Sequence, residues 1–530
     1  MSIAKRAGRM SLAVGISRIL GLVREQVFAF LFGAGFYSDA FLLAFRIPNL
    51  FRDLFAEGAF STAFISVFAK QAEKEKQKTL ARDISLVLSI CVLTLSLVLY
   101  FTAPAVVELL ASEFKSSEGK FELTVGLTRF LLPFLFFASL AALCMGILNT
   151  MGSYFIPAMG AAAFNVASVV IGGGLGFYFL KSNDTSSIWG FAVGSIVGGF
   201  LQWAVQWGRM REYGFTPALG LLNLFRPKRW KLAFENPAVK RVFIIMGPSV
   251  IAVAAMQINV MVNTFFAAGL EEGSVSWLVY AYRLVHFPMG IFGVAISMAS
   301  LPELSRLVSQ PLQFGNTLKR ALRMATILTI GSTAGLIFLG EPIVALIFER
   351  GRFIVEDTIQ TNDALTFYSI GLIAFALNKI LLMAFYAMEN IWIPSMISAF
   401  SIVTNLVFAY YFSTTMGHEG LALSVSLSSI LNVFMLLGFL LRKKINVFDL
   451  RWLKIILASM VAIIPMWLAV QLDLVGIVLR HRFDGVFVFA PLLLLLIAVL
   501  GAAYVSTVAL FTQEGRDFAK RIASRFGFKR

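Results

Sequence analysis

Four arginines lie within or beside the first two apolar stretches of this 530-residue chain: Arg18, Arg24, Arg46 and Arg52. A charged side chain near the centre of a bilayer costs at least ~2.5–3.5 kcal/mol, so such residues are expected to face a protein interior or a water-filled cavity. Arginine suits phosphate because its planar guanidinium donates paired hydrogen bonds and keeps its charge when dehydrated. The four residues therefore predict a cationic lining that binds a multiply charged anion.

The spacing of these arginines requires bent helices if all of them are to face one cavity. The members of each pair are six positions apart, about 240° of net helical rotation, so a straight helix would not align them. Gly21 in the first pair and Pro48 in the second are residues at which a helix can bend. Arg283 corresponds to Arg46 in a weak internal repeat, so the second half of the chain is expected to add to the lining.

Carboxylates and a hydroxyl accompany the arginines. The acidic residues could simply neutralise the arginines, form ion pairs that break and reform during a transport cycle, or carry protons. Ser276 could add a neutral hydrogen bond to a bound anion. The predicted gating or charge-balancing residues are Glu25, Asp39, Asp53 and Glu57.

Composition indicates the elements that must position these side chains. The chain is 58% hydrophobic and only 14% charged, whereas soluble domains average about 25% charged residues. These values exclude a cytosolic enzyme as the default, and also a disordered or fibrous protein. Because a spanning helix needs about 20 apolar residues, we predict an all-α polytopic membrane protein with about 14 transmembrane helices, from 10–33 to 486–511.

The formal net charge of +16 is explained by membrane topology. With the N-terminus in the cytoplasm and an even number of spans, most Lys and Arg residues fall in loops on the cytoplasmic side. Both termini are therefore predicted to be cytoplasmic. No basic region forms a separate soluble domain, so nucleic-acid binding is not expected.

No catalytic, cofactor or metal motif is recognisable. The chain lacks a P-loop, a G-x-S-x-G elbow and an H-E-x-x-H motif, and it contains two Cys and three His. The cluster Gly172–Gly174 lies within an apolar stretch and predicts close helix packing. We therefore expect a transporter that is not an enzyme and is driven by an ion gradient, the membrane potential or the gradient of its substrate.

The chain is also expected to divide into lobes. Residues 41–47 and 278–284 are weakly similar, which predicts six-helix units that recur in the same orientation. The predicted domains are an N-terminal lobe at 1–215, a cytoplasmic linker at 216–242, a C-terminal lobe at 243–445, and two further helices with a tail at 446–530.

Several motifs resemble the signature of the MurJ (MviN) family of the MOP exporter superfamily, and the resemblance covers essentially the whole chain. In the second half, residues 273–277 and 282–288 are also similar to that family. The N-terminal block is the more specific part of the resemblance. Its motifs are Ser17–Arg24, Phe32–Gly35, Ser38–Phe41, Pro48–Arg52 and Phe55–Phe60.

The resemblance implies a lipid II flippase with two MATE-like six-helix lobes and two extra C-terminal helices, whose hydrophobic groove would take the lipid tail. Such proteins move undecaprenyl-diphosphate-linked disaccharide-pentapeptide from the cytoplasmic to the periplasmic leaflet of the bacterial inner membrane for peptidoglycan synthesis. It further implies lipid II, membrane lipids and cell-wall synthesis machinery as partners, and no cofactor. The family's functional positions match Arg18, Arg24, Arg52, Arg283, Asp39, Glu57 and Ser276.

Some positions depart from the family pattern. Asn263 stands where a sodium site of this fold has an acid, and Asn405 is followed by Ala409 in place of a second acid. Loss of two carboxylates weakens cation binding severely, so we predict no sodium site of that kind. The alternatives are an O-antigen or exopolysaccharide lipid-linked oligosaccharide flippase and a multidrug exporter, although the latter would favour acids in the cavity over arginines.

Overall fold

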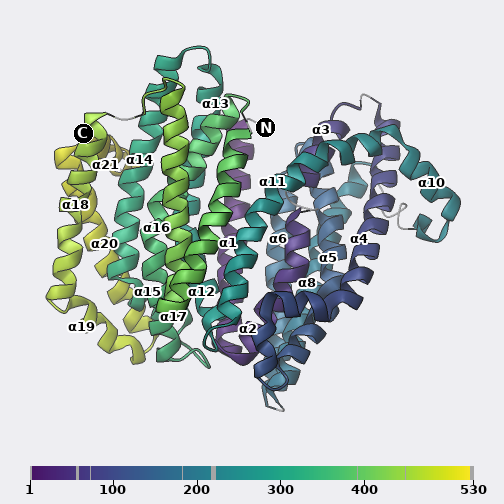
Figure 1. Ribbon diagram of the computed structural model, residues 1–530, viewed down its shortest axis with the longest axis horizontal. Helices are drawn as coiled ribbons and strands as arrows, with labels where there is room; N and C mark the ends of the chain where they lie inside the picture. Colours follow the sequence, from purple (N-terminus) through teal and green to yellow (C-terminus); the bar gives the residue numbers. More distant parts are fainter. Residues whose placement is uncertain are drawn as a thin grey trace. The chain divides into compact units, whose positions relative to one another are not determined.

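The computed structural model describes residues 3–54, 59–71, 73–181, 183–215, 222–390, 392–447 and 449–525. Within these ranges every regular element is helical (Figure 1). Ten of the described helices are long and apolar enough to cross a membrane. The all-α polytopic architecture is thus confirmed, and the number of about 14 spans stays a prediction.

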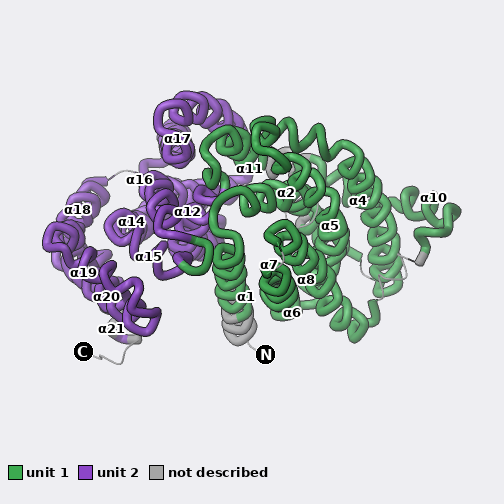
Figure 2. Tube along the Cα trace, turned by 90° about the horizontal axis from the view of Figure 1, so that it is seen from below, with its two compact units in different colours: residues 1–275, 350–353 green, residues 276–349, 354–530 purple. Residues whose placement is uncertain are grey.

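The helices form two compact units, coloured separately in Figure 2. Unit 1 comprises residues 1–275 and 350–353. Its helices are α1 (Ile3–Phe32), α2 (Phe36–Arg52), α3 (Ala59–Phe68), α4 (Lys74–Ala111), η2 (Ser112–Ser116), α5 (Lys120–Thr150), α6 (Phe155–Ala167), η3 (Ser168–Gly173), α7 (Gly174–Leu180), α8 (Asp184–Glu212), η4 (Leu222–Phe225), α10 (Pro227–Glu235) and α11 (Pro237–Ala268).

Unit 2 comprises residues 276–349 and 354–530. Its helices are α12 (Ser274–Pro288), whose first two residues lie in unit 1, η5 (Met289–Val294), α13 (Ala295–Arg306), α14 (Pro311–Phe338), α15 (Gly340–Phe348), α16 (Val355–Ala387), α17 (Trp392–Arg442), α18 (Leu450–Gln471), α19 (Leu474–Arg480), η6 (His481–Phe483), α20 (Val486–Phe511) and α21 (Gln513–Arg525). By packing, α11 is therefore part of unit 1, while the predicted lobes and their boundaries stay a prediction.

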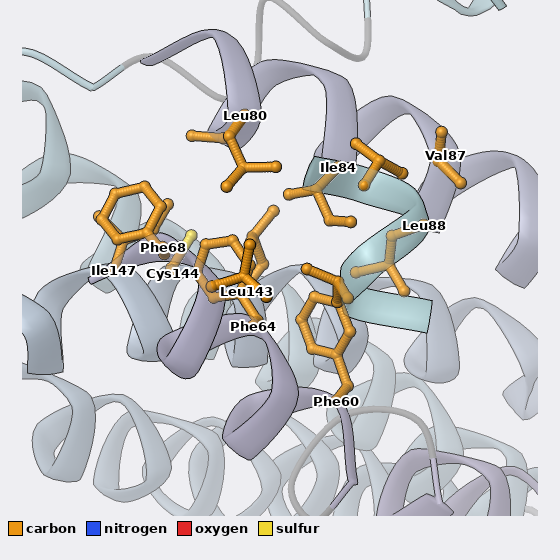
Figure 3. Packing of buried hydrophobic residues seen from close by; sticks show 14 of the residues in the cluster. Phe60, Phe64, Phe68, Leu80, Ile84, Val87, Leu88, Leu143, Cys144 and Ile147 are labelled. Carbon is orange, nitrogen blue, oxygen red and sulfur yellow. The ribbon is translucent and has the colours of Figure 1, made fainter. Parts of the chain in front are cut away.

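An aromatic core holds one end of unit 1 together. Phe60, Phe64 and Phe68 recur every four residues and so share one face of α3. Figure 3 shows them against side chains of α4 and α5, and all three are almost completely buried. Cys144 is buried in the same cluster, whereas Cys91 on α4 is exposed.

The glycine cluster of the third long apolar segment packs against α8. A Cβ atom added to Gly194 would lie 2.3 Å from the Cα atom of Gly172. Since no side chain fits at that distance, α8 and the η3 segment approach each other through backbone contact. The predicted packing role is confirmed for Gly172 and Gly173, whereas a Cβ atom at Gly174 would meet nothing within 4 Å.

Candidate substrate-binding site

Arg24 of α1 and Arg52 of α2 lie over a pair of touching phenyl rings in unit 1. The guanidinium carbon of Arg24 is 5.3 Å from the ring centre of Phe164 on α6. That of Arg52 is 6.0 Å from the ring centre of Phe134 on α5. The two ring centres are 5.5 Å apart. We call Arg24, Arg52, Phe134 and Phe164 the arginine–phenyl site; it brings together two of the predicted binding residues from different helices.

Each of these arginines pairs with the carboxylate that follows it in sequence. Arg24 Nη2 is 3.3 Å from Glu25 Oε1, and Arg52 Nη2 is 3.0 Å from Asp53 Oδ1. Gln257 of α11 donates a hydrogen bond to the second oxygen of Asp53, at 3.1 Å. The side chains of Arg24 and Arg52 remain 19% and 21% exposed. Because ion pairs of partly exposed neighbours are weak, an incoming anion with more oxygens can replace the carboxylates.

Arg46 connects α2 to α11. Its guanidinium donates to the hydroxyl of Thr264, which in turn donates to the carbonyl of Val260 at 2.8 Å. Thr264 is buried at 2% exposure. A polar contact of this kind fixes one helix against another, so Arg46 has a packing partner in unit 1 that the sequence alone did not reveal.

Arg18 is exposed on α1, which continues as a helix through Gly21. At Gly21 the helix lies close to α6, because an added Cβ would be 3.5 Å from the amide nitrogen of Asn165. That amide donates to the carbonyl of Ser17 at 3.1 Å. Helix α2 likewise continues through Pro48. Arg18 is thus more exposed than Arg24, as their rotation of about 240° on one helix implies.

Asp39 is part of a buried ion pair at the start of α2. Lys120 Nζ, at the first residue of α5, is 3.2 Å from Asp39 Oδ2, and the two side chains are 4% and 2% exposed. The same oxygen accepts the backbone N–H of Gly273 at 2.9 Å. Glu272 lies 3.9 Å from the Lys120 ammonium. The sequence gives no sign of this pair, because a lysine at the start of a helix is usually exposed.

The remaining residues singled out from the sequence lie in unit 2, in α11 of unit 1, or outside the described residues. Ser276 on α12 is fully buried, and Arg283 on the same helix is exposed. Asn405 is fully buried, and its side-chain oxygen accepts a hydrogen bond from Ser424 at 3.2 Å. Asn263 lies in α11 of unit 1 and is partly buried. Glu57 falls at 55–58, outside the described residues.

Unit 2 contains an apolar cavity of about 510 Å³. It is lined by residues of α12, η5, α14, α15, α18, α20 and α21, including Phe287, Ile291, Leu339, Tyr504 and Phe518. Phe287 follows Arg283 by four residues, so the two side chains share a face of α12 about 6 Å apart along the axis. A charged head group at Arg283 would therefore lie one helical turn from the first apolar lining residue.

No group of three or more His, Cys, Asp or Glu side chains is placed to hold a metal ion among the residues that the structure describes. The guanidinium groups of Arg24 and Arg52 can bind an anion next to apolar surface. No covalent step is needed for that chemistry.

The fold defines the class of the protein. It is similar to an inward-facing MATE-family multidrug transporter of the MOP superfamily, with a TM-score of 0.66 and 17% identity, over 83% of this chain and 98% of that one. At that identity the likeness concerns the fold alone. The chain is thus a multi-pass membrane protein with the fold of MOP-superfamily transporters.

The particular family follows from three findings. The family "Lipid II flippase MurJ" matches residues 28–516. The lipid II flippase MurJ of Burkholderia cenocepacia is 35% identical over 471 residues, covering 87% of this chain and 89% of the relative. A solved structure of lipid II flippase MurJ in an inward closed conformation has a TM-score of 0.74 at 26% identity, over 96% of this chain and 99% of that one. The chain belongs to the lipid II flippase MurJ family.

Proposed function

We propose that this protein is a lipid II flippase that carries the undecaprenyl-diphosphate-linked peptidoglycan precursor from the cytoplasmic to the periplasmic leaflet. The family match over residues 28–516 is the observation on which this function rests. The protein resides in the bacterial inner membrane with both termini in the cytoplasm, as its distribution of Lys and Arg predicts. It transports without chemical conversion of the substrate and is not an enzyme.

The arginine–phenyl site binds the diphosphate. Guanidinium groups form short, charge-assisted, paired hydrogen bonds with phosphate oxygens. The diphosphate replaces Glu25 and Asp53 as the partner of Arg24 and Arg52, so that these carboxylates balance the arginines when no substrate is bound. Arg18, Arg283 and Ser276 supply further donors to the same substrate, and Asp39 and Glu57 act in gating.

The apolar cavity of unit 2 takes part of the prenyl chain of the substrate. Its lining is apolar, and it begins at Phe287, one turn after Arg283. The remainder of the chain stays in the lipid phase, where its transfer costs no hydrophobic free energy. Alternating exposure of the charged head-group site to the two sides of the membrane then completes transport, in contact with the cell-wall synthesis machinery.

Reconstitution tests this function directly. We expect purified full-length protein in liposomes to expose labelled lipid II on the opposite leaflet faster than it does a polyprenyl-diphosphate-linked O-antigen unit. Expression of this gene should also restore the growth of a bacterium depleted of its own flippase. Equal transport of both substrates would favour the oligosaccharide flippase, and transport of a cationic drug alone would favour the multidrug exporter.

A further inference from the structure

A basic amphipathic segment of unit 1 has no role in the proposed transport site. It consists of η4 and α10, residues 222–235, and we call it the interfacial segment. Figures 1 and 2 show α10 at the outer edge of unit 1, beside one end of α4. The segment and the start of α11 carry six exposed cations: Arg226, Lys228, Arg229, Lys231, Lys240 and Arg241.

Large apolar side chains of the interfacial segment are exposed together with these cations. Phe225 is 91% exposed and Leu232 is 58% exposed. Trp230, Ala233 and Phe234 stand at positions i, i+3 and i+4 and so share a face of α10; of the three, only Ala233 is buried. A water-exposed linker gains nothing from such a face, whereas a helix that lies in the head-group layer buries it.

A hydrogen bond sets the depth of the segment relative to the apolar stretches. The side chain of Asn236, which separates α10 from α11, donates to Asp83 Oδ2 of α4 at 2.9 Å. Asp83 is the last charged residue of α4 before an uncharged stretch at 84–107, and α11 likewise carries no charge after Arg241. The segment therefore lies where both helices pass from charged to apolar sequence, which is the level of the membrane–water interface.

We propose that the interfacial segment is a binding surface for anionic phospholipid head groups, with Lys228, Arg229 and Lys231 contacting the phosphates and Phe225, Trp230 and Phe234 entering the acyl boundary. The positive charge of the segment favours an anionic lipid head group as its ligand. Within residues 222–235 four cations stand beside a single acid, Glu235, whose carboxylate is 4.0 Å from Lys231. A polybasic helix beside a membrane span is attracted to anionic lipid by about 1 kcal/mol per cation near the surface.

The test places a spin label at Phe234→Cys, on the same face of α10 as Trp230, in full-length protein whose Cys91 and Cys144 are replaced by Ala. The protein is put into nanodiscs of phosphatidylcholine alone or of phosphatidylcholine with phosphatidylglycerol. We expect the label to be shielded from a water-soluble paramagnetic relaxant in the anionic discs and open to it in the neutral ones. Lys228→Gln, Arg229→Gln and Lys231→Gln together should weaken binding of the segment to the anionic discs roughly a hundredfold, and so make the label accessible to the relaxant there.

A matched triple variant, Arg442→Gln, Lys443→Gln and Lys444→Gln, removes three exposed cations of unit 2 and should leave the label where it is. Equal water access in both kinds of disc would overturn the proposal, as would an equal shift in the control variant. Shielding that arises only when a soluble protein or RNA is added to neutral discs would overturn it in favour of that partner. The readout needs no lipid II, so it is independent of the proposed flippase function.

Discussion

Arginines in the two units are held in different ways. In unit 1, Arg24 and Arg52 each pair with the next residue in sequence and lie on phenyl rings. In unit 2, Arg323 of α14 is 10% exposed and is held by two carboxylates from distant segments, Asp449 at 2.7 Å and Glu514 at 3.0 Å. Asp449 also caps α18 by accepting the backbone N–H of Trp452 at 2.9 Å.

We propose that this difference separates an arginine that binds substrate from an arginine that stabilises the fold. The two carboxylates around Arg323 tie the starts of α18 and α21 to α14, so exchanging them for another anion would release two helices. Glu25 and Asp53 are instead the sequence neighbours of their arginines, so these two ion pairs themselves join no second helix. A charge within an apolar helix is thus available to a ligand when its partner is local, and it fixes the fold when its partners are remote.

Removing the structural arginine should have the largest effect on stability. Arg323→Ala leaves two carboxylates without their cation, and breaking such a buried pair costs about 3–5 kcal/mol. We expect the low end of that range because Asp449 is 28% exposed. The apparent melting temperature in detergent measures it, with the exposed Arg320→Ala on the same helix as control. Equal melting temperatures for the two variants would contradict the structural role.

The buried Lys120–Asp39 pair allows a structural ion pair to be compared with the partly exposed arginine pairs within unit 1. Lys120→Ala leaves the Asp39 carboxylate without this cation, and Asp39→Asn in the same chain should restore part of the loss. A double-mutant cycle should give a coupling of about 1–3 kcal/mol. The exposed pair of Lys115 and Glu108 serves as control and should give less than about 1 kcal/mol. Additive effects of the Lys120 and Asp39 substitutions would show that the pair does not stabilise the fold.

Conservative substitution at the binding arginines should change transport and not stability. Arg24→Lys or Arg52→Lys keeps the charge but loses the paired donors. Loss of one charge-assisted hydrogen bond, about 1.5 kcal/mol, predicts a roughly tenfold slower flipping rate. The melting temperature should stay within a degree or two of wild type on the scale of surface substitutions. A rate equal to wild type would mean that these arginines act only through their charge.

We expect a smaller effect on stability from the titration of Glu341 in unit 2. Burial raises the pKa of Glu341, and the nearby Arg482 only partly opposes this rise. A raised pKa means that the folded protein favours the protonated acid. Protonated Glu341 therefore adds to the free energy of unfolding below its ordinary pKa of 4.5. This stabilisation is lost as the pH rises through the pKa of the folded protein. Glu341→Gln should therefore flatten the dependence of melting temperature on pH above 4.5. An unchanged slope would assign the dependence to another group.

Much of the architecture could be predicted from local sequence. Long apolar stretches predict the all-helical membrane fold. Gly172 was expected at a close helix contact because it lies in a glycine cluster within an apolar stretch, and the structure has this contact. The convergence of Arg24 and Arg52 also follows the prediction that in-span arginines share an environment. Local sequence patterns are enough to predict these features because the bilayer itself requires apolar helices whose backbone groups are hydrogen-bonded internally.

The remaining features depend on which helices meet. The chain has 52 Phe, so nothing in the sequence singles out Phe134 and Phe164 as the rings under the arginines. The burial of Lys120 depends on α2 and α5 starting side by side, and the packing of α11 with unit 1 depends on contacts with α3 and α4. Contacts between residues far apart in sequence leave no periodic signal.

The most direct test of the account is lipid II flipping by the double variant Arg24→Ala, Arg52→Ala in proteoliposomes, beside Arg129→Ala. Arg129 is an arginine of α5 that donates to the carbonyl of Tyr100 at 2.9 Å and has no part in the arginine–phenyl site. We predict that the double variant inserts and melts like wild type but flips lipid II at least about a hundredfold more slowly, while Arg129→Ala flips normally. Flipping at the wild-type rate by the double variant would contradict the assignment of these two guanidinium groups to the diphosphate.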